Sequence, residues 1–131
     1  LSKTATFSES LLGDGPVAGR TPAGITPATG YAFVFATPLS DAACNRPLYY
    51  NFTDLRGFSW ANGEYRTTLY NHSRAPNAEV LDCLAALMTT ADKSKQYAGF
   101  GWRTPRSRHV GGVNVTMADA AVRFVEDSVD A

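Results

Sequence analysis

Two histidines and an aspartate are the side chains of this sequence best suited to metal-assisted chemistry. His72 and His109 are the chain's two histidines, and Asp119 follows His109 after nine intervening residues. Imidazole and carboxylate groups are common zinc ligands, and bound zinc activates water for hydrolysis. If the fold brings these three side chains together, the sequence fits a hydrolase that depends on a divalent metal such as zinc. No HExxH-type spacing encodes such a site locally.

A structural role for His109 is the favoured alternative. The histidine stands just before Gly111 and Gly112. Glycines let the backbone approach other groups closely and adopt unusual dihedral angles. We therefore expect the His109 ring to form a hydrogen bond to nearby backbone and to fix the point where the chain enters its last β-hairpin.

Aromatic side chains, where a sheet leaves them open to solvent, provide a second kind of chemistry, the stacking of rings on sugars. The candidates are Trp60, Tyr65 and Trp102. If they line one pocket, the chain is a binding module for a carbohydrate or another small solute. Aromatic residues pack more often into a hydrophobic core, and a core role is the favoured interpretation.

The cysteine count leaves two possibilities open. Cys44 and Cys83 are compatible with one disulfide and equally with two free thiols. Neither residue lies in a CxxC motif, which argues against a redox-active pair or a zinc knuckle.

Alternation and turn signals predict the elements that must position these residues. Residues 4–8 and 31–35 read as strands, and 12–30 as a long glycine- and proline-rich loop. Ser40 predicts an N-cap for one helical turn at 41–44.

The second half carries two predicted hairpins. Residues 57–60 and 64–71 flank Ala61-Asn62-Gly63, and Asn-Gly is the strongest short hairpin signal. Residues 113–125 form a terminal hairpin whose turn holds Asp119 and Ala120. Residues 72–81 read as a polar loop.

One segment is ambiguous, and the fold class follows from the rest. Residues 82–90 fit a short helix or a covered loop, and propensity favours the helix. The predicted fold is mainly β (α+β): an antiparallel sheet with long loops and one or two short helices, ending in a β-hairpin.

Length and charge limit the function classes. The 131 residues suit a single globular domain, residues 1–131. Twelve basic and twelve acidic residues give a net charge of zero, which argues against a nucleic-acid partner. No apolar run approaches 18 residues, so we expect no membrane contact by this chain.

The segment SRHVGGVNVTMADAAVRFV, residues 107–125, resembles the C-terminal signature of a large pilin-like family abundant in planctomycetes. That signature is a His, nine residues and Asp-Gly, and this chain matches it at His109, Gly111, Gly112, Asn114 and Asp119. Ala120 stands where the family has Gly. The segments TFSESLLGDG (6–15), GFSWANGEY (57–65) and TLYNHSRAPN (68–77) agree as well. The family is the domain of unknown function 1559, also labelled solute-binding protein family ten.

The resemblance implies a place in a larger protein. Members of the family begin with a prepilin-type leader and a hydrophobic helix, so we expect this chain to be the C-terminal, β-rich head of a longer exported protein. An exported protein meets an oxidising compartment, and the resemblance therefore predicts a Cys44–Cys83 disulfide.

The leading functional hypothesis is a non-enzymatic head domain in surface assembly or type II secretion, located at the cell surface or in the periplasm. Its expected partners are other pilin-like subunits or surface components. It is expected to need no cofactor. The alternatives are the carbohydrate or small-solute binding module and the metal-dependent hydrolase, with a divalent metal such as zinc as its cofactor.

Overall fold

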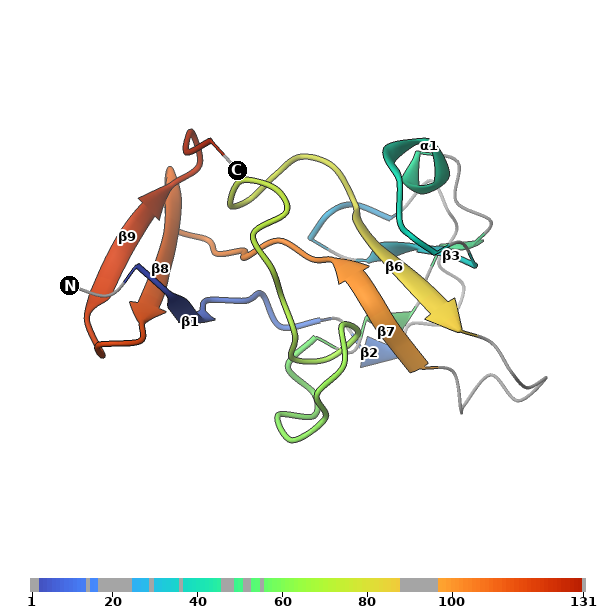
Figure 1. The fold of residues 1–131 in the computed structure, drawn as a ribbon, viewed down its shortest axis with the longest axis horizontal. Coiled ribbons are helices and arrows are strands. Elements are labelled where there is room, and N and C mark those ends of the chain that lie inside the picture. Colours follow the sequence, from blue (N-terminus) through green and yellow to red (C-terminus); the bar gives the residue numbers. More distant parts are fainter. Residues whose placement is uncertain are drawn as a thin grey trace.

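The computed structural model describes residues 3–13, 15–16, 25–28, 30–35, 37–45, 49–50, 53–54, 56–87 and 97–130. These residues form short strands and one helical turn (Figure 1). In chain order the elements are β1 (Ala5–Ser8), β2 (Gly15–Pro16), β3 (Tyr31–Val34), α1 (Asp41–Cys44), β4 (Tyr49–Tyr50), β5 (Thr53–Asp54), β6 (Asp82–Leu87), β7 (Tyr97–Trp102), β8 (Gly112–Met117) and β9 (Val122–Glu126). The predicted mainly β fold with long loops is confirmed.

Three strands from the two ends of the chain form the terminal sheet, in the order β1-β8-β9. Both pairings are antiparallel, and β8 and β9 form the predicted terminal hairpin. The alternation of β8 divides this sheet into two faces. Val113 and Val115 are 0% and 2% exposed on one face, and Phe7 and Val122 flank Thr116 on the other.

The hairpin turn holds Asp119 and Ala120 as predicted, but its geometry is not type I′. Ala120 has a φ of +63°, whereas Asp119 is not among the described residues with positive φ. The N–H of Ala120 donates to the carbonyl of Met117 at 2.9 Å, and the N–H of Met117 donates to that of Ala121 at 2.8 Å. This is a three-residue loop closed by a left-handed residue, the position that usually carries glycine.

Four strands form the central sheet, in the order β4-β3-β6-β7 (Figure 1, right). The outer pairings are antiparallel, but β3 and β6 run parallel, with Ala32 opposite Cys83. All four residues of β3 are buried. Tyr31, Phe33 and Leu84 form a core cluster against which Tyr65 packs.

The helix predicted at 82–90 is wrong over its described part, because residues 82–87 form strand β6. Tertiary packing overrides the helical propensity of this segment. Residues 82–85 are all buried between two neighbouring strands, and a strand buried on both faces shows no alternation. Residues 88–90 lie outside the described part of the chain.

The predicted N-cap and disulfide are both confirmed. The Ser40 hydroxyl accepts a hydrogen bond from the N–H of Ala43 at 3.2 Å, which starts the single turn of α1. Cys44, at the end of that turn, is bonded to Cys83 on β6. The bridge lies in a buried cluster with Val34 and Ala85, so it fastens α1 to the central sheet.

The hairpin predicted at 57–60 and 64–71 is wrong. Residues 56–81, all of them described, form turns and irregular backbone. The physical reason is Glu64, whose carbonyl accepts the N–H groups of residues 67–69, each at 3.1 Å, and curls the chain back on itself. Asn62-Gly63 makes a turn within this curl rather than between two strands.

The remaining predictions are met in part. Strand β3 ends at Val34, one residue short of the expected strand 31–35. The predicted loop 12–30 contains the two-residue strand β2, which pairs with β5, and much of the rest lies outside the described residues. Within the described part, no helix is both long enough and apolar enough to cross a bilayer.

Candidate functional site

A single carboxylate, that of Glu9, joins the ends of the chain. Glu9 follows β1 directly. Its Oε1 lies 2.9 Å from Nε2 of His109, and its Oε2 accepts the backbone N–H of Asn114 at 2.8 Å. The side-chain amide of Asn114 donates to Oε1 at 3.1 Å. Two residues of the C-terminal signature therefore meet on one acidic side chain.

The surroundings of Glu9 favour its charged form. The backbone N–H of Asn114 is the largest influence and lowers the pKa of the Glu9 carboxyl; partial burial opposes this shift, and the Asn114 amide and His109 add to it. The His109 side chain is 56% exposed and that of Glu9 is 33% exposed. The pair lies at the surface, where water screens it and its net contribution to stability is small.

The two glycines of the signature are required for different reasons. Gly111 has a φ of +82° and open space around it, so only its backbone conformation demands glycine. Gly112 has no room for a side chain. A Cβ there would collide with the carbonyl oxygen of Val125 and lie 2.7 Å from the ring of Phe124.

Two polar side chains fix the loop that carries His109. The Ser107 hydroxyl donates to the carbonyl of Gly112 at 2.6 Å and accepts the N–H of His109 at 3.0 Å. The Asn77 carbonyl accepts the N–H of Ser107 at 2.8 Å, and its amide donates to Asp127 at 2.8 Å. Asn77 itself has a φ of +51°. The loop is therefore held from both sides before β8 begins.

An open hollow of about 520 Å³ lies beside this loop. It is lined by residues 26–28, 77–79 and 106–110, together with Leu11 and Asp127. His109 thus contacts the carboxylate of Glu9 and also lines the hollow.

The other predicted metal ligands lie elsewhere. Asp119 follows β8 whereas His109 precedes it, and a six-residue strand is about 20 Å long. The Asp119 carboxylate accepts the N–H of Ala121 at 3.1 Å within its own turn. The His72 ring stands edge-on to that of Tyr70, with centroids 5.3 Å apart. Among the residues that the structure describes, no group of three or more His, Cys, Asp or Glu could hold a metal ion.

The three predicted binding aromatics do not meet in one pocket. Tyr65 packs against the core cluster of the central sheet, and Trp102 packs beside the disulfide with the Arg74 guanidinium 5.4 Å from its ring centroid. Trp60 is 89% exposed. None of them lines the hollow.

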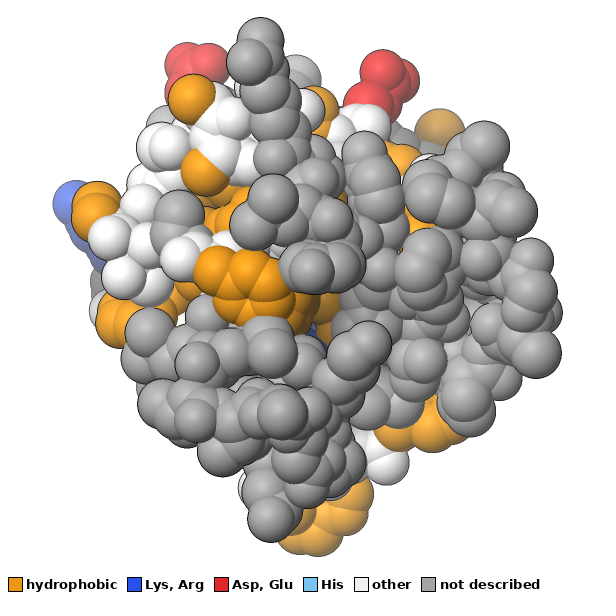
Figure 2. Space-filling view, turned by 90° about the vertical axis from the view of Figure 1, so that its right-hand side faces the viewer, with side chains coloured by type: hydrophobic (Ala, Val, Ile, Leu, Met, Phe, Trp, Pro, Cys, Tyr) orange, Lys and Arg blue, Asp and Glu red, His pale blue; other side chains and the backbone are white. Residues whose placement is uncertain are grey.

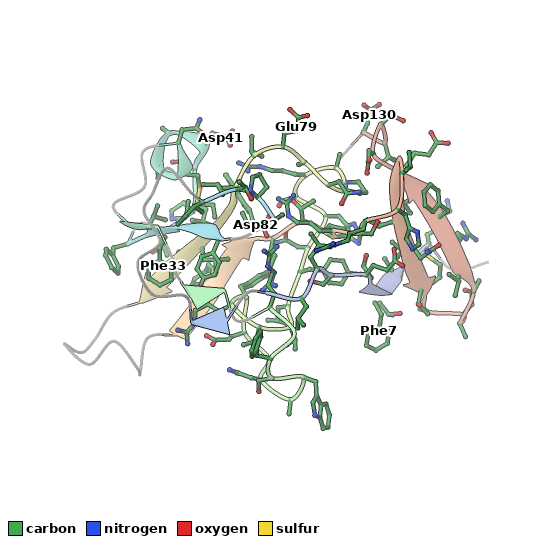
Figure 3. The ribbon with its side chains drawn as sticks, turned by 180° about the vertical axis from the view of Figure 1, so that it is seen from behind. Phe7, Phe33, Asp41, Glu79, Asp82 and Asp130 are labelled. Atoms are coloured by element: carbon green, nitrogen blue, oxygen red, sulfur yellow. A yellow bond between two sulfur atoms is a disulfide. The ribbon has the colours of Figure 1, made fainter. Side chains whose placement is uncertain are left out.

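Two of the three arginines that precede His109 are buried. Arg103 and Arg106 are 3% and 4% exposed. Arg106 donates to the carboxylate of Asp82 at 2.8 Å and to the carbonyls of Ala78 and Val80. Figure 3 shows Asp82 in the interior of the molecule. Arg108 remains exposed.

Sequence reasoning missed Glu9, Asn77 and Ser107. Glu9 stands in the segment TFSESLLGDG that carries the resemblance, but nothing near it in the sequence indicates its partners. Its contacts to His109 and Asn114 span 100 and 105 residues.

Comparison with known proteins found no match among curated proteins or among solved structures. A family profile does match, over residues 1–131, and it includes every residue of the signature. The chain therefore belongs to the family described as "Protein of unknown function (DUF1559)".

Proposed function

We propose that this chain is the non-enzymatic, outward-facing head of a pilin-like or pseudopilin-like protein that acts in surface assembly or secretion. One observation carries the proposal. His109 and Asn114, two of the three polar side chains of the signature, are both hydrogen-bonded to Glu9 and so link the end of β1 to β8 and the loop before it. Side chains that could do chemistry are thereby used to build a scaffold.

The disulfide supports a location outside the cytoplasm. Cys44 and Cys83 are bonded, and disulfides persist in oxidising compartments such as the periplasm and the cell surface. Both locations are consistent with a role in an exported assembly.

The exterior of the domain suits protein partners. Phe7 and Val122 are 72% and 65% exposed on one face of the terminal sheet, and Phe124 beside them is 51% exposed. Figure 3 shows Phe7 projecting from the sheet. Apolar surface of this kind marks interaction sites, and the partners proposed are other pilin-like subunits or surface components.

Protease shaving of intact cells that make the protein tests its location. We expect an antibody against this domain to lose its signal when protease is added to whole cells, while a cytoplasmic protein stays intact. Chemical cross-linking of the same cells should give multiples of the protein mass. Protection of the domain until the cells are lysed contradicts the proposal.

A small-solute or carbohydrate module is the second candidate, and the hollow beside His109 favours it. Its volume of about 520 Å³ lies within the range of ligand sites, roughly 300–1,000 Å³. NMR titration with a panel of monosaccharides and oligosaccharides tests it. Saturable shifts confined to residues 77–79 and 106–110 would support the module, and their absence would remove it.

A further inference from the structure

We infer that Trp60 of one molecule inserts into the hollow beside His109 of the next, joining copies of this chain head to tail. The inference deepens the proposed assembly function and rests on it. It follows from three features: a projecting side chain, a preformed hollow and their positions on the molecule.

The projecting side chain is Trp60. It is 89% exposed, and its neighbour Phe58 is 54% exposed. The loop that carries them projects below the two sheets in Figure 1 (green), and Figure 2 shows hydrophobic side chains at this lower edge. Tryptophan is among the residues that most often dominate binding energy at protein interfaces.

The loop under Trp60 is rigid. Glu64 is 1% exposed, and its carboxylate accepts hydrogen bonds from Arg66 at 2.7 Å and from Asn62 at 3.2 Å. The hydroxyls of Thr67 and Thr68 both donate to the carbonyl of Asn62 at 2.6 Å. Because these bonds already order the loop, little conformational entropy is lost when Trp60 binds.

The hollow is equally well ordered. Arg56, 1% exposed, donates to the carbonyls of Pro27 and Ala28 on one wall, at 3.3 and 2.6 Å. Arg106 donates to the carbonyl of Ala78 on another, at 2.8 Å. Buried guanidinium groups thus hold two of the lining segments in place, so the hollow exists before any partner arrives.

The chemistry of the hollow suits an indole. Pro27, Ala28 and Ala78 supply apolar lining for the ring. An indole N–H needs an acceptor when it leaves water, and two acidic residues, Glu79 and Asp127, are among the residues that line the hollow. The volume of about 520 Å³ leaves room for part of the loop as well.

The two features lie on different surfaces, because no residue of the Trp60 loop lines the hollow. Figure 3 places Glu79, part of the hollow lining, at the upper side of the molecule, whereas the loop of residues 57–64 lies at the lower side. A contact between two different surfaces repeats from copy to copy, and it builds an open array when the geometry does not close into a ring. Such an array is what a filament or surface layer requires.

One inserted side chain buries less surface than a stable dimer needs, so we expect a weak contact in solution. Interfaces below about 1,200 Å² are typically transient. Within an assembly that tethers neighbouring heads, a high effective concentration compensates for this weakness.

Sedimentation equilibrium of the purified chain tests the inference. The protein concentration should reach about 1 mM, because weak contacts have dissociation constants of that order. We expect the wild type to form dimers and larger species, and Trp60→Ala to weaken association at least tenfold. Leu69→Ala, nine residues further along the chain and 40% exposed, is the control and should associate like the wild type. A wild type that stays monomeric overturns the inference.

A mixing experiment separates head-to-tail from symmetric contacts. Ala78→Trp fills the hollow; Ala28→Trp serves if the first variant does not fold. Neither the filled variant nor Trp60→Ala should associate alone, but an equimolar mixture should form a dimer and stop there, because only one contact is available. A mixture that stays monomeric, or filled variants that associate like the wild type, contradicts the inference.

Two further outcomes identify other roles for Trp60 and for the domain. Flotation with anionic lipid vesicles that requires Trp60, without self-association, would assign the tryptophan to a membrane surface and overturn the inference. Protease shaving is independent of these measurements. A head that associates through Trp60 but is protected in intact cells would leave the inference standing and remove the surface location.

Discussion

The terminal sheet and the segment of residues 56–81 are both well ordered, but by opposite means. In the terminal sheet, strands pair in regular antiparallel registers and bury one face at Val113 and Val115. Residues 56–81 contain no strand. They are fixed by buried polar groups, Glu64 within the segment and Arg106 from outside it.

The difference shows that order in this protein does not require regular secondary structure. A backbone ladder satisfies its own hydrogen-bonding groups, whereas irregular backbone needs side chains to do so. Arg103 donates to the carbonyl of Tyr65 and Arg106 donates to those of Ala78 and Val80. Charged side chains replace the missing strand partners.

The largest expected effect comes from removing one of these side chains. Arg106→Ala leaves the carboxylate of Asp82, 3% exposed, without its cation, and should lower the free energy of unfolding by about 3–5 kcal/mol. Urea unfolding measures the change. Arg108→Ala, two residues away and exposed, is the control and should stay within about 0.5 kcal/mol of the wild type. Equal effects of the two substitutions would show that burial of Arg106 contributes nothing.

Alanine substitutions at Gly111 and Gly112 distinguish backbone strain from lack of space in the terminal sheet. Gly112→Ala forces β8 and β9 apart and should cost about 1–3 kcal/mol. Gly111→Ala is disfavoured only by the positive φ at this position and should lower the free energy of unfolding by about 1 kcal/mol. Thermal unfolding of both variants checks the order, and a larger loss at Gly111 would contradict the assignment.

A smaller effect on stability is expected from neutralising Glu9, the charged side chain at the end of β1 in the terminal sheet. Because folding lowers the pKa of Glu9, its contribution is complete above the ordinary glutamate value of 4.5 and is lost as the pH falls through the lowered value. Glu9→Gln should lose about 0.5–1.5 kcal/mol at pH 7, and the difference from wild type should shrink as the pH falls below 4.5.

Unfolding measured from pH 3 to pH 7 tests this pH dependence, with His109→Ala measured alongside. A His109→Ala variant that loses less stability than Glu9→Gln, and melts below the wild type both with and without a chelator, fits a supporting role for His109. A chelator that destabilises the wild type but leaves His109→Ala unchanged would instead make His109 a metal ligand.

The smallest expected effect is a gain. Ala120 has a φ of +63°, which glycine adopts without strain, so Ala120→Gly should raise stability by up to about 1 kcal/mol. Ala118→Gly in the same turn is a control that should not raise it. Differential scanning calorimetry resolves the two, and a destabilised Ala120→Gly would mean that its methyl group contributes packing.

The terminal hairpin could be predicted because its signals are local. Alternation in residues 113–117 reports one buried face, and the turn at Asp119 follows directly. The disulfide needed the family resemblance, since two cysteines alone leave pairing open. Strand β6 could not be predicted from local signals, because its parallel partner β3 is remote in sequence and its burial on both faces removes the alternation.

The site was only half visible in the sequence. The signature residues His109 and Asn114 stand close together, but Glu9, which joins them, comes from the other end of the chain. The curl around Glu64 shows the opposite failure. Asn62-Gly63 is a strong local hairpin signal, but the segment forms no strands. The buried carboxylate and the backbone carbonyl of Glu64 accept hydrogen bonds from nearby residues and hold the backbone in a curl.

The burial of three arginines also protects the chain from cleavage at those positions. Trypsin cleaves after basic residues in accessible backbone, and Arg56, Arg103 and Arg106 are withdrawn from it. Arg108 is exposed on the loop before β8. A nick there would separate the β8–β9 hairpin from the rest of the chain covalently, yet β1 and Glu9 would still hold it, and the two pieces would elute from a sizing column as one molecule.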